Sequence, residues 1–430
     1  MRQIGRQIMR ENVTYLKHGD ESSFGIASHV TEAVQEIITG VTDRGDSALF
    51  EYTERFDGVT RDRLAVSDAE IEEAHHELTT SERDAIDQTI ANVRSFHEEQ
   101  FQHFQEFERE FRPGMHLGQR IVPIQRVGTY IPGGRHPLVA TPAMTIVPAS
   151  IVGVDTIVAC APPQSDGTIE PAQLYAMDQA GADDIYCVGG AQAIAAMAFG
   201  TESIPSVSKI TGPGNQYTTE AKRQVYGHVG IDLMAGPSEV LILTDETADP
   251  ALAATDLLAQ AEHDPNSRPI LVATDEDIAR ETIAQVNQQL PRLDTEDVAR
   301  ECWQQNGEVV LTDDLETAVA VVNDYAMEHV QLLIDEPRSV VDDLYNYGCL
   351  FIGEHSPVVF GDKSAGTNHS LPTLEAATYT GGISTATYCK ILTHLEMTAD
   401  GADQLVEQTV QICELEGTHA HRLSAEARRL

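Results

Sequence analysis

Residues 185–199 read Ile-Tyr-Cys-Val-Gly-Gly-Ala-Gln-Ala-Ile-Ala-Ala-Met-Ala-Phe. The apolar run Ile185–Val188 predicts a buried strand, and the alanine-rich stretch Ala191–Phe199 predicts a helix. The two glycines between them favour a tight turn. A strand, a glycine turn and a helix in this order offer backbone N–H groups and a helix N-terminus to a phosphate group. The stretch therefore predicts one unit of a parallel α/β sheet.

The same alternation of short apolar runs and helical stretches continues on both sides, from about residue 120 to residue 352. It predicts an α/β fold with parallel sheets. Residues 1–110 and 381–430 instead have the spacing of helices, so helical elements are expected at both ends. The expected strands are Arg120–Pro123, Thr156–Cys160, Ile185–Val188, Val207–Ile210, Glu239–Thr244, Ile270–Thr274, Glu308–Leu311, Val330–Ile334 and Cys349–Ile352.

The chain has 430 residues, with 28 Lys and Arg against 68 Asp and Glu, and a net charge of −40. Repulsion of this size argues against nucleic acid or an anionic membrane as partner. Only five of the basic residues are lysines, and an acidic, lysine-poor surface is typical of a halophilic protein. The chain has no apolar run long enough to span a membrane and no secretory signal, so a cytoplasmic location is expected.

Six cysteines are scattered along the chain, and none forms a CxxC pair. In a chain of this length they are expected to be reduced thiols rather than a disulfide framework. A zinc site would therefore use His, Asp, Glu or Gln. Gln260 and His263 are three residues apart on a predicted helix and share one face. Asp362 and His369 lie in a glycine-rich segment expected to be a loop, where α/β scaffolds often carry sites.

Two further clusters carry groups suited to proton transfer or metal binding. Glu328 and His329 stand side by side before a predicted strand, where one could accept a proton and the other activate water. The tail offers Glu416, His419 and His421 within six residues. Taken alone, each cluster is more typical of solvated side chains, helix ends or loops than of a site.

Four glycine-rich turns adjoin predicted strands, at residues 128–134, 189–192, 212–215 and 236–239. The dinucleotide fingerprint G-x-G-x-x-G is absent. The residues alone thus predict an α/β enzyme with candidate phosphate, nucleotide and metal sites.

Taken together and in this order, the motifs resemble the histidinol dehydrogenase family over nearly the whole chain. The matching segments are Arg44-Gly45-Asp46 with Phe56-Asp57-Gly58, Tyr130–Gly134, Gly189–Gln192, Gly212–Asn215, Ile231-Asp232 with Ala235–Glu239, Gln260–His263, Glu328-His329, Gly361-Asp362 with Gly366–Thr373, and Glu416–His421.

The resemblance implies two incomplete Rossmann-like domains with parallel sheets, plus helical N- and C-terminal elements. Residues 1–25 would form an N-terminal extension. Residues 26–129 with 238–380 would form the domain carrying the metal and catalytic residues, and residues 130–237 the NAD side. Residues 381–430 would form a helical tail that contributes to the partner subunit's site in an intertwined homodimer.

The resemblance also implies zinc and NAD as cofactors and the oxidation of a primary alcohol, through a bound aldehyde, to a carboxylate with two NAD. The zinc ligands would be Gln260, His263, Asp362 and His421, the last from the partner subunit. His419 is the nearby competitor, and the spacing from Glu416 favours His421.

In the implied reaction His329 accepts the alcohol proton and Glu328 activates water. The family would hold NAD without a regular glycine loop, which accounts for the missing fingerprint. The positions that match its substrate contacts are Ser238, His369 and Glu416, and those that match its cofactor contacts are Tyr130, Gln192 and Asn215.

The substrate is expected from a paralogous branch that includes sulfopropanediol 3-dehydrogenase. The segments Val13–Lys17, Arg135–Ala140, Ala159–Pro163, Phe360–Lys363, and Tyr379–Gly382 leading to Tyr388–Lys390 resemble that branch. A sulfonate would need a cation, which Arg135, Lys363 or Lys390 could supply. The alternative is L-histidinol, although Met327 stands where histidinol enzymes usually have proline.

Two classes outside this reading are an inactive binding protein and a zinc hydrolase without NAD. All expected catalytic and ligand positions are intact, which argues against the first. An assay of whether activity depends on NAD would distinguish a zinc hydrolase from a dehydrogenase.

Overall fold

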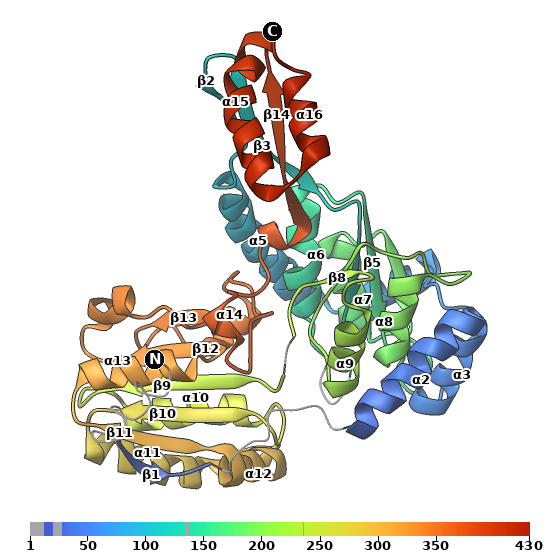
Figure 1. Ribbon diagram of the computed structural model, residues 1–430. Coiled ribbons are helices and arrows are strands. Elements are labelled where there is room, and N and C mark those ends of the chain that lie inside the picture. Colours follow the sequence, from blue (N-terminus) through green and yellow to red (C-terminus); the bar gives the residue numbers. More distant parts are fainter. Residues whose placement is uncertain (1–12, 20–27, 134–136, 235) are drawn as a thin grey trace.

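Three sheets organise the computed structural model of the chain, which describes residues 13–19, 28–133, 137–234 and 236–430 (Figure 1). Two of them are built mainly of parallel strands covered by helices, and the third is antiparallel. The α/β fold with parallel sheets is therefore confirmed. Within the described ranges, no helix combines the length and the hydropathy needed to span a membrane.

The larger sheet has six strands, in the spatial order β1 (Val13–Lys17), β11 (Glu308–Thr312), β10 (Arg268–Ala273), β9 (Glu239–Thr244), β12 (His329–Leu333) and β13 (Cys349–Ile352). All but β1 run parallel, and β9 and β12 are buried along their whole length, as strands covered on both faces must be. Strand β1 pairs with β11 in the antiparallel direction. The expected N-terminal extension thus contributes an edge strand, while residues 1–12 and 20–25 lie outside the described residues.

Four helices connect and cover this sheet, namely α10 (Pro250–Ala261), α11 (Glu276–Gln289), α12 (Glu296–Asn306) and α13 (Leu315–Tyr325). Successive side chains of a strand point to opposite faces. Ile242 accordingly joins the cluster that contains Leu257 of α10, and Leu243 joins the cluster that contains Val322 of α13. Helix α10 begins where the Asp249 side chain accepts a hydrogen bond from the Ala251 N–H, with Pro250 in the first turn.

The smaller parallel sheet has five strands, in the order β6 (Asp184–Cys187), β5 (Thr156–Ala161), β4 (Arg126–Tyr130), β7 (Lys209–Thr211) and β8 (Gly230–Ile231). Its helices are α6 (Thr141–Val152), α7 (Pro171–Ala180), α8 (Gly190–Phe199) and α9 (Gln216–Val225). Residues 185–199 lie in β6 and α8 and the turn between them, as predicted.

The N-terminal helices pack on the smaller sheet, so the expected grouping of residues 26–129 with 238–380 is wrong. These helices are α2 (Ser28–Arg44), α3 (Asp46–Asp57), α4 (Asp68–Glu77) and α5 (Thr80–Gln102). Val34 of α2 shares a buried cluster with Ile194 of α8, and Val93 of α5 shares one with Met144 of α6. Their apolar faces complete the cover of that sheet. Periodicity identifies such faces but not the surface that they meet.

An arm projects from the smaller sheet and carries the C-terminus at its far end (Figure 1). It consists of β2 (Phe107–Arg112), β3 (Met115–Pro123) and β14 (Cys389–Met397), in the order β14-β3-β2, with α15 (Ala399–Glu416) and α16 (His419–Glu426). The expectation of helix throughout 381–430 is therefore wrong for β14. That strand is exposed or half-buried along its length, so it lacks the apolar run that marks a core strand.

Tyr388 anchors the root of the arm in the core. It ends the 3₁₀ turn Thr385–Tyr388, is fully buried, and donates a hydrogen bond from its hydroxyl to the Thr145 carbonyl at 2.7 Å.

We expect Tyr388→Phe to lower the free energy of unfolding by about 1 kcal/mol, the typical contribution of one hydrogen bond. Tyr388→Ala should cost about 3–5 kcal/mol because it also leaves a cavity. Urea unfolding measures both, and equal losses would contradict this anchoring role.

Candidate active site

The first residue of β9 fixes a buried acid–imidazole pair at the start of β12. Glu328 and His329 are 6% and 3% exposed. The Glu239 N–H donates to Glu328 Oε2 at 2.9 Å, and the Glu239 carbonyl lies 2.8 Å from His329 Nδ1. Since a carbonyl only accepts, Nδ1 carries the proton of the neutral ring, and Nε2 is the nitrogen able to take one up.

Asp362 faces that second nitrogen. Its Oδ1 lies 3.3 Å from His329 Nε2, and its backbone carbonyl lies 2.8 Å from His369 Nδ1. The second nitrogen of His369 is 3.3 Å from the Thr141 hydroxyl. Thr141 begins α6, a helix that packs on the smaller sheet. Gly361 and Asp362 belong to the short helix α14 (Val358–Lys363) rather than to a loop, so the loop expected from Gly361 begins only after Lys363.

Burial and charge act against each other in this cluster. Burial raises the pKa of the Glu328 carboxyl well above its ordinary value. Burial alone would lower the pKa of His329, but the Glu328 and Asp362 carboxylates outweigh it and raise that pKa. Burial would raise the pKa of Asp362, but the His329 imidazole outweighs burial and holds it below its usual range. Strongly perturbed groups gathered in one place are typical of active sites.

Gln260 lies in the last turn of α10, which packs against α14, whereas His263 lies in the turn after the helix ends. Gln260 is buried, and its Nε2 has no hydrogen-bond partner. The oxygen and nitrogen of an amide can be exchanged in assignment, so this is an amide end available for a ligand. Burial lowers the pKa of His263, which senses the charges of Lys363 and Asp362. An amide, an imidazole and an ionised carboxylate are a donor set that fits zinc.

Among the described residues, no three His, Cys, Asp or Glu side chains are placed to share a metal ion. Three of the expected zinc ligands come from one chain. Only two of them, His263 and Asp362, belong to these four residue types, and the third is Gln260. The remaining expected ligand, His421, lies in α16, while Glu416 ends α15. Figure 1 shows both helices in the arm, away from α14 and β12. One chain therefore does not bring His421, His419 or Glu416 to this cluster.

Ser238 directly precedes Glu239, and its carbonyl accepts the Arg268 N–H at 3.0 Å. It is half-buried and stands at the entry of β9, beside the acid–imidazole pair. Both Glu239 and His329 are first residues of their strands. The pair therefore lies at the amino ends of β9 and β12, whereas α/β sheets more often carry their sites at the carboxyl ends.

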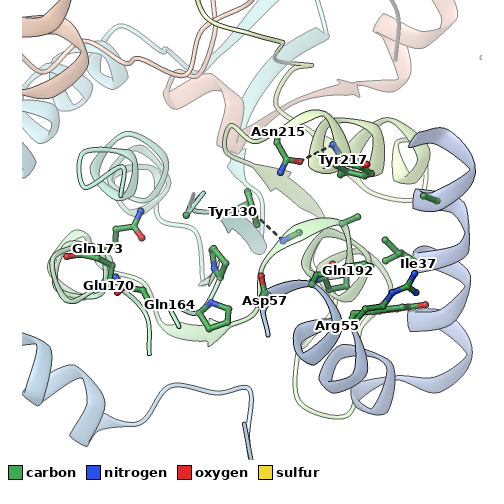
Figure 2. A pocket seen from close by; sticks show the side chains of 18 of the residues that line it. Ile37, Arg55, Asp57, Tyr130, Gln164, Glu170, Gln173, Gln192, Asn215 and Tyr217 are labelled. Atoms are coloured by element: carbon green, nitrogen blue, oxygen red, sulfur yellow. Dashed lines mark hydrogen bonds between the residues drawn. The ribbon is translucent and has the colours of Figure 1, made fainter. Parts of the chain in front are cut away.

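A cavity of about 920 Å³ lies at the carboxyl ends of the smaller sheet. Tyr130, Gln192 and Asn215, the expected cofactor contacts, all line it (Figure 2). The Tyr130 hydroxyl accepts the Gly190 N–H at 3.1 Å, which joins the end of β4 to the glycine turn before α8. Asn215 caps α9 by accepting the N–H groups of Tyr217 and Thr218 at 2.9 and 3.2 Å. The structure thus brings these three residues together.

Asp57 lines the same cavity, and sequence reasoning gave it no role (Figure 2). Its Oδ2 is buried without a hydrogen-bond partner, and burial raises its pKa to about 6. A carboxylate is unfavourable at the C-terminus of a helix such as α3, because that end carries negative partial charge. This mismatch was the available signal. Tyr217 and Arg55 also line the cavity and were likewise missed.

Glu262 stands between two expected ligands but points elsewhere, since it accepts a hydrogen bond from the Thr295 hydroxyl at 2.8 Å. Lys390 lies on β14 in the arm, and Lys363 is exposed at the end of α14. Arg135, the third candidate for binding a sulfonate, lies outside the described residues, as do Gly134, His136 and Ala235 of the matching motifs.

Two sheets, one with a buried acid–imidazole pair and the other with a cavity beside a glycine turn, define an α/β enzyme. Residues 22–429 match the histidinol dehydrogenase family. The chain is 46% identical to the histidinol dehydrogenase of Methanothermobacter thermautotrophicus over 90% of its length and 91% of that protein. It is 42% identical to a histidinol dehydrogenase homolog of Shouchella clausii over 96% and 98% of the two chains.

A solved histidinol dehydrogenase from Elizabethkingia anophelis has the same fold, with a TM-score of 0.91 and 34% identity over 99% of this chain and 95% of that one. The chain belongs to the histidinol dehydrogenase family and is an oxidoreductase of that family. The resemblance inferred from the motifs is confirmed.

The pKa of Asp57 predicts a stability change with a defined sign. A carboxyl whose pKa is higher in the folded state destabilises the fold once pH rises above its ordinary value, because the unfolded chain ionises more readily. Asp57→Asn should therefore raise the free energy of unfolding at pH 8, by at most about 3 kcal/mol. Near pH 3.5 the gain should vanish. Urea unfolding at both pH values measures it, and a gain that is equal at both would contradict the burial argument.

Proposed function

We propose that the chain oxidises L-histidinol to L-histidine with NAD and zinc, through a bound aldehyde. The observation that carries the proposal is the buried Glu328–His329 pair, held by one residue of β9, Glu239, and facing Asp362. Relatives named histidinol dehydrogenase, one of them 46% identical, support this substrate. They favour it over sulfopropanediol, the substrate first expected, for which neither the comparisons nor the positions of Lys363 and Lys390 provide support.

His329 would act as the general base in the first oxidation. Its Nδ1 proton is engaged by the Glu239 carbonyl, so Nε2 can accept the proton of the alcohol hydroxyl. NAD supplies the acceptor for the hydride that leaves the carbon, once in each of the two oxidations. Tyr130, Gln192, Asn215 and Asp57 would hold it, since they line one cavity at the glycine turns.

Glu328 would serve the second oxidation. It lies beside the imidazole, with Oε2 3.4 Å from His329 Nδ1. Burial raises the pKa of its carboxyl, so the ionised carboxylate would be a stronger base toward water. The water adds to the aldehyde carbon and supplies the second oxygen of the carboxylate. Holding the aldehyde in place prevents its escape between the two steps.

Gln260, His263 and Asp362 would hold zinc together with His421 of a second copy. When bound, the metal orients the substrate and polarises its oxygen. The arm of one chain places His421 far from its own cluster, and it also exposes apolar side chains, among them Leu395 and Leu415 at 60% and 85%. An exposed apolar surface of this kind is typical of an interface. Both features support a homodimer in which the sites are shared.

Glu328→Gln separates the two oxidations. The variant should still reduce NAD in the first step, because His329 is intact, but it should release or retain aldehyde and produce histidine at least about 100-fold more slowly. Rapid-quench analysis of aldehyde and histidine measures both products, with the wild-type protein as reference. Asp256→Asn, at a half-buried carboxyl that accepts a hydrogen bond from Gln331, provides a matched control. Equal rates of histidine formation in Glu328→Gln and the wild type would refute the role of Glu328.

Intersubunit complementation tests the shared site. Gln260→Ala and His421→Ala should each be nearly inactive as separate homodimers. When they are unfolded and refolded together in equal amounts, half of the dimers combine both chains, and each of these has one intact site. About a quarter of wild-type activity should return if His421 is donated by the partner. No recovery in mixed dimers, confirmed by mass, would show that both residues serve one chain's site.

A further inference from the structure

We propose that Lys222 and Asp232 are positioning residues for the cofactor, because their buried ion pair fixes the glycine turn 212–215 at the edge of the cavity. The inference rests on the proposed use of NAD. It goes beyond it by assigning a role to two charges that line neither the cavity nor the acid–imidazole cluster. Lys222 lies on α9, and Asp232 follows β8.

The pair binds both polar groups of one residue in the turn. The two side chains are 4% and 1% exposed and form a direct ion pair. Lys222 Nζ donates to the Gly212 carbonyl at 2.9 Å, and the Gly212 N–H donates to Asp232 Oδ2 at 2.7 Å. Asp232 Oδ1 also accepts the Leu233 N–H at 2.7 Å. The peptide groups on both sides of Gly212 are thus held from two different elements.

A different backbone conformation at Gly212 would change the wall of the cavity. Its φ is +110°, and a Cβ at this position would lie 2.2 Å from the Tyr130 carbonyl. The turn therefore packs against the end of β4, whose Tyr130 faces the cavity. Three residues later Asn215 caps α9 and lines the same cavity (Figure 2). Lys222 is on the helix that Asn215 caps, so the helix, the turn and the ion pair form one closed unit.

Stability alone does not account for these charges. Removing two charges from water is costly, and an apolar pair of similar size is often at least as stabilising. What an apolar pair cannot do is bind the N–H and the carbonyl of Gly212 in one orientation. Lys209, the other cation near Asp232, is engaged elsewhere, since its Nζ donates to the Thr387 carbonyl at 2.6 Å. The arrangement is therefore directed at the turn.

The test is NAD binding by the zinc-loaded full-length protein, measured by calorimetry, together with kcat and KM for both substrates. The double variant Lys222→Met, Asp232→Asn removes both charges and the bond to the Gly212 carbonyl. We expect its Kd and KM for NAD to rise about tenfold, the size typical of lost outer-shell support. The kcat, the KM for the alcohol and the zinc content should stay close to those of the wild type.

Two further variants make the result specific. Lys222→Met alone removes the bond to the Gly212 carbonyl and also leaves the Asp232 carboxylate buried without its cation, so it should raise the Kd for NAD at least as much as the double variant does. Val225→Ala leaves a cavity under the same helix, at a side chain that is 1% exposed and lies at the opposite end of α9 from the turn. It should lower the melting temperature without changing the Kd for NAD, which separates loss of stability from loss of positioning.

Folded Lys222 variants that bind NAD as tightly as the wild type would overturn the assignment and leave the proposed function intact. Failure of both Lys222 variants to fold, with Val225→Ala folded, would overturn it as well, because the pair would then serve folding. A wild-type protein that binds no NAD would overturn the proposed function and this inference together.

Discussion

The site depends on the hydrogen bonds of one residue, Glu239, to the Glu328 and His329 side chains. Parallel pairing sets His329 opposite Val240, next to Glu239, and burial on both faces of β9 and β12 holds that register. The N–H of Glu239 then supports an acid and its carbonyl supports a base. The carboxylate of Glu239 is itself buried and bound by Arg268 at 3.2 Å, which fixes the start of the strand. A slip of one residue would separate the two groups.

The two sheets carry their candidate sites at opposite ends of their strands. The larger sheet presents its acid–imidazole pair at the amino ends of its strands, and the smaller sheet presents its cavity at the carboxyl ends. His369 links the two, because it contacts the Asp362 backbone and the Thr141 hydroxyl of α6. In the proposed enzyme this linkage would fix the position of the reacting carbon of the alcohol relative to the cofactor cavity. The ion pair of Lys222 and Asp232 would stabilise the wall of that cavity.

Buried elements and their turns could be predicted from the sequence. The strands over Glu239–Thr244 and Cys349–Ile352 have the expected ends because apolar runs bounded by turns define them. Strand β14 could not be predicted, since it is stabilised by pairing with β3 rather than by an apolar face. The expected cofactor contacts came from the resemblance to the family, and the structure places all three beside one cavity. Asp57 was missed because the segment that carries it approaches the cavity only through the packing of α2 and α3 on the smaller sheet.

The most direct test of the account is NADH formation by the zinc-loaded protein at high salt, with L-histidinol and sulfopropanediol assayed side by side. The account predicts turnover of L-histidinol, with two NADH formed for each molecule converted to histidine, and none with sulfopropanediol. Turnover of sulfopropanediol alone, or no NADH from either alcohol, would contradict it.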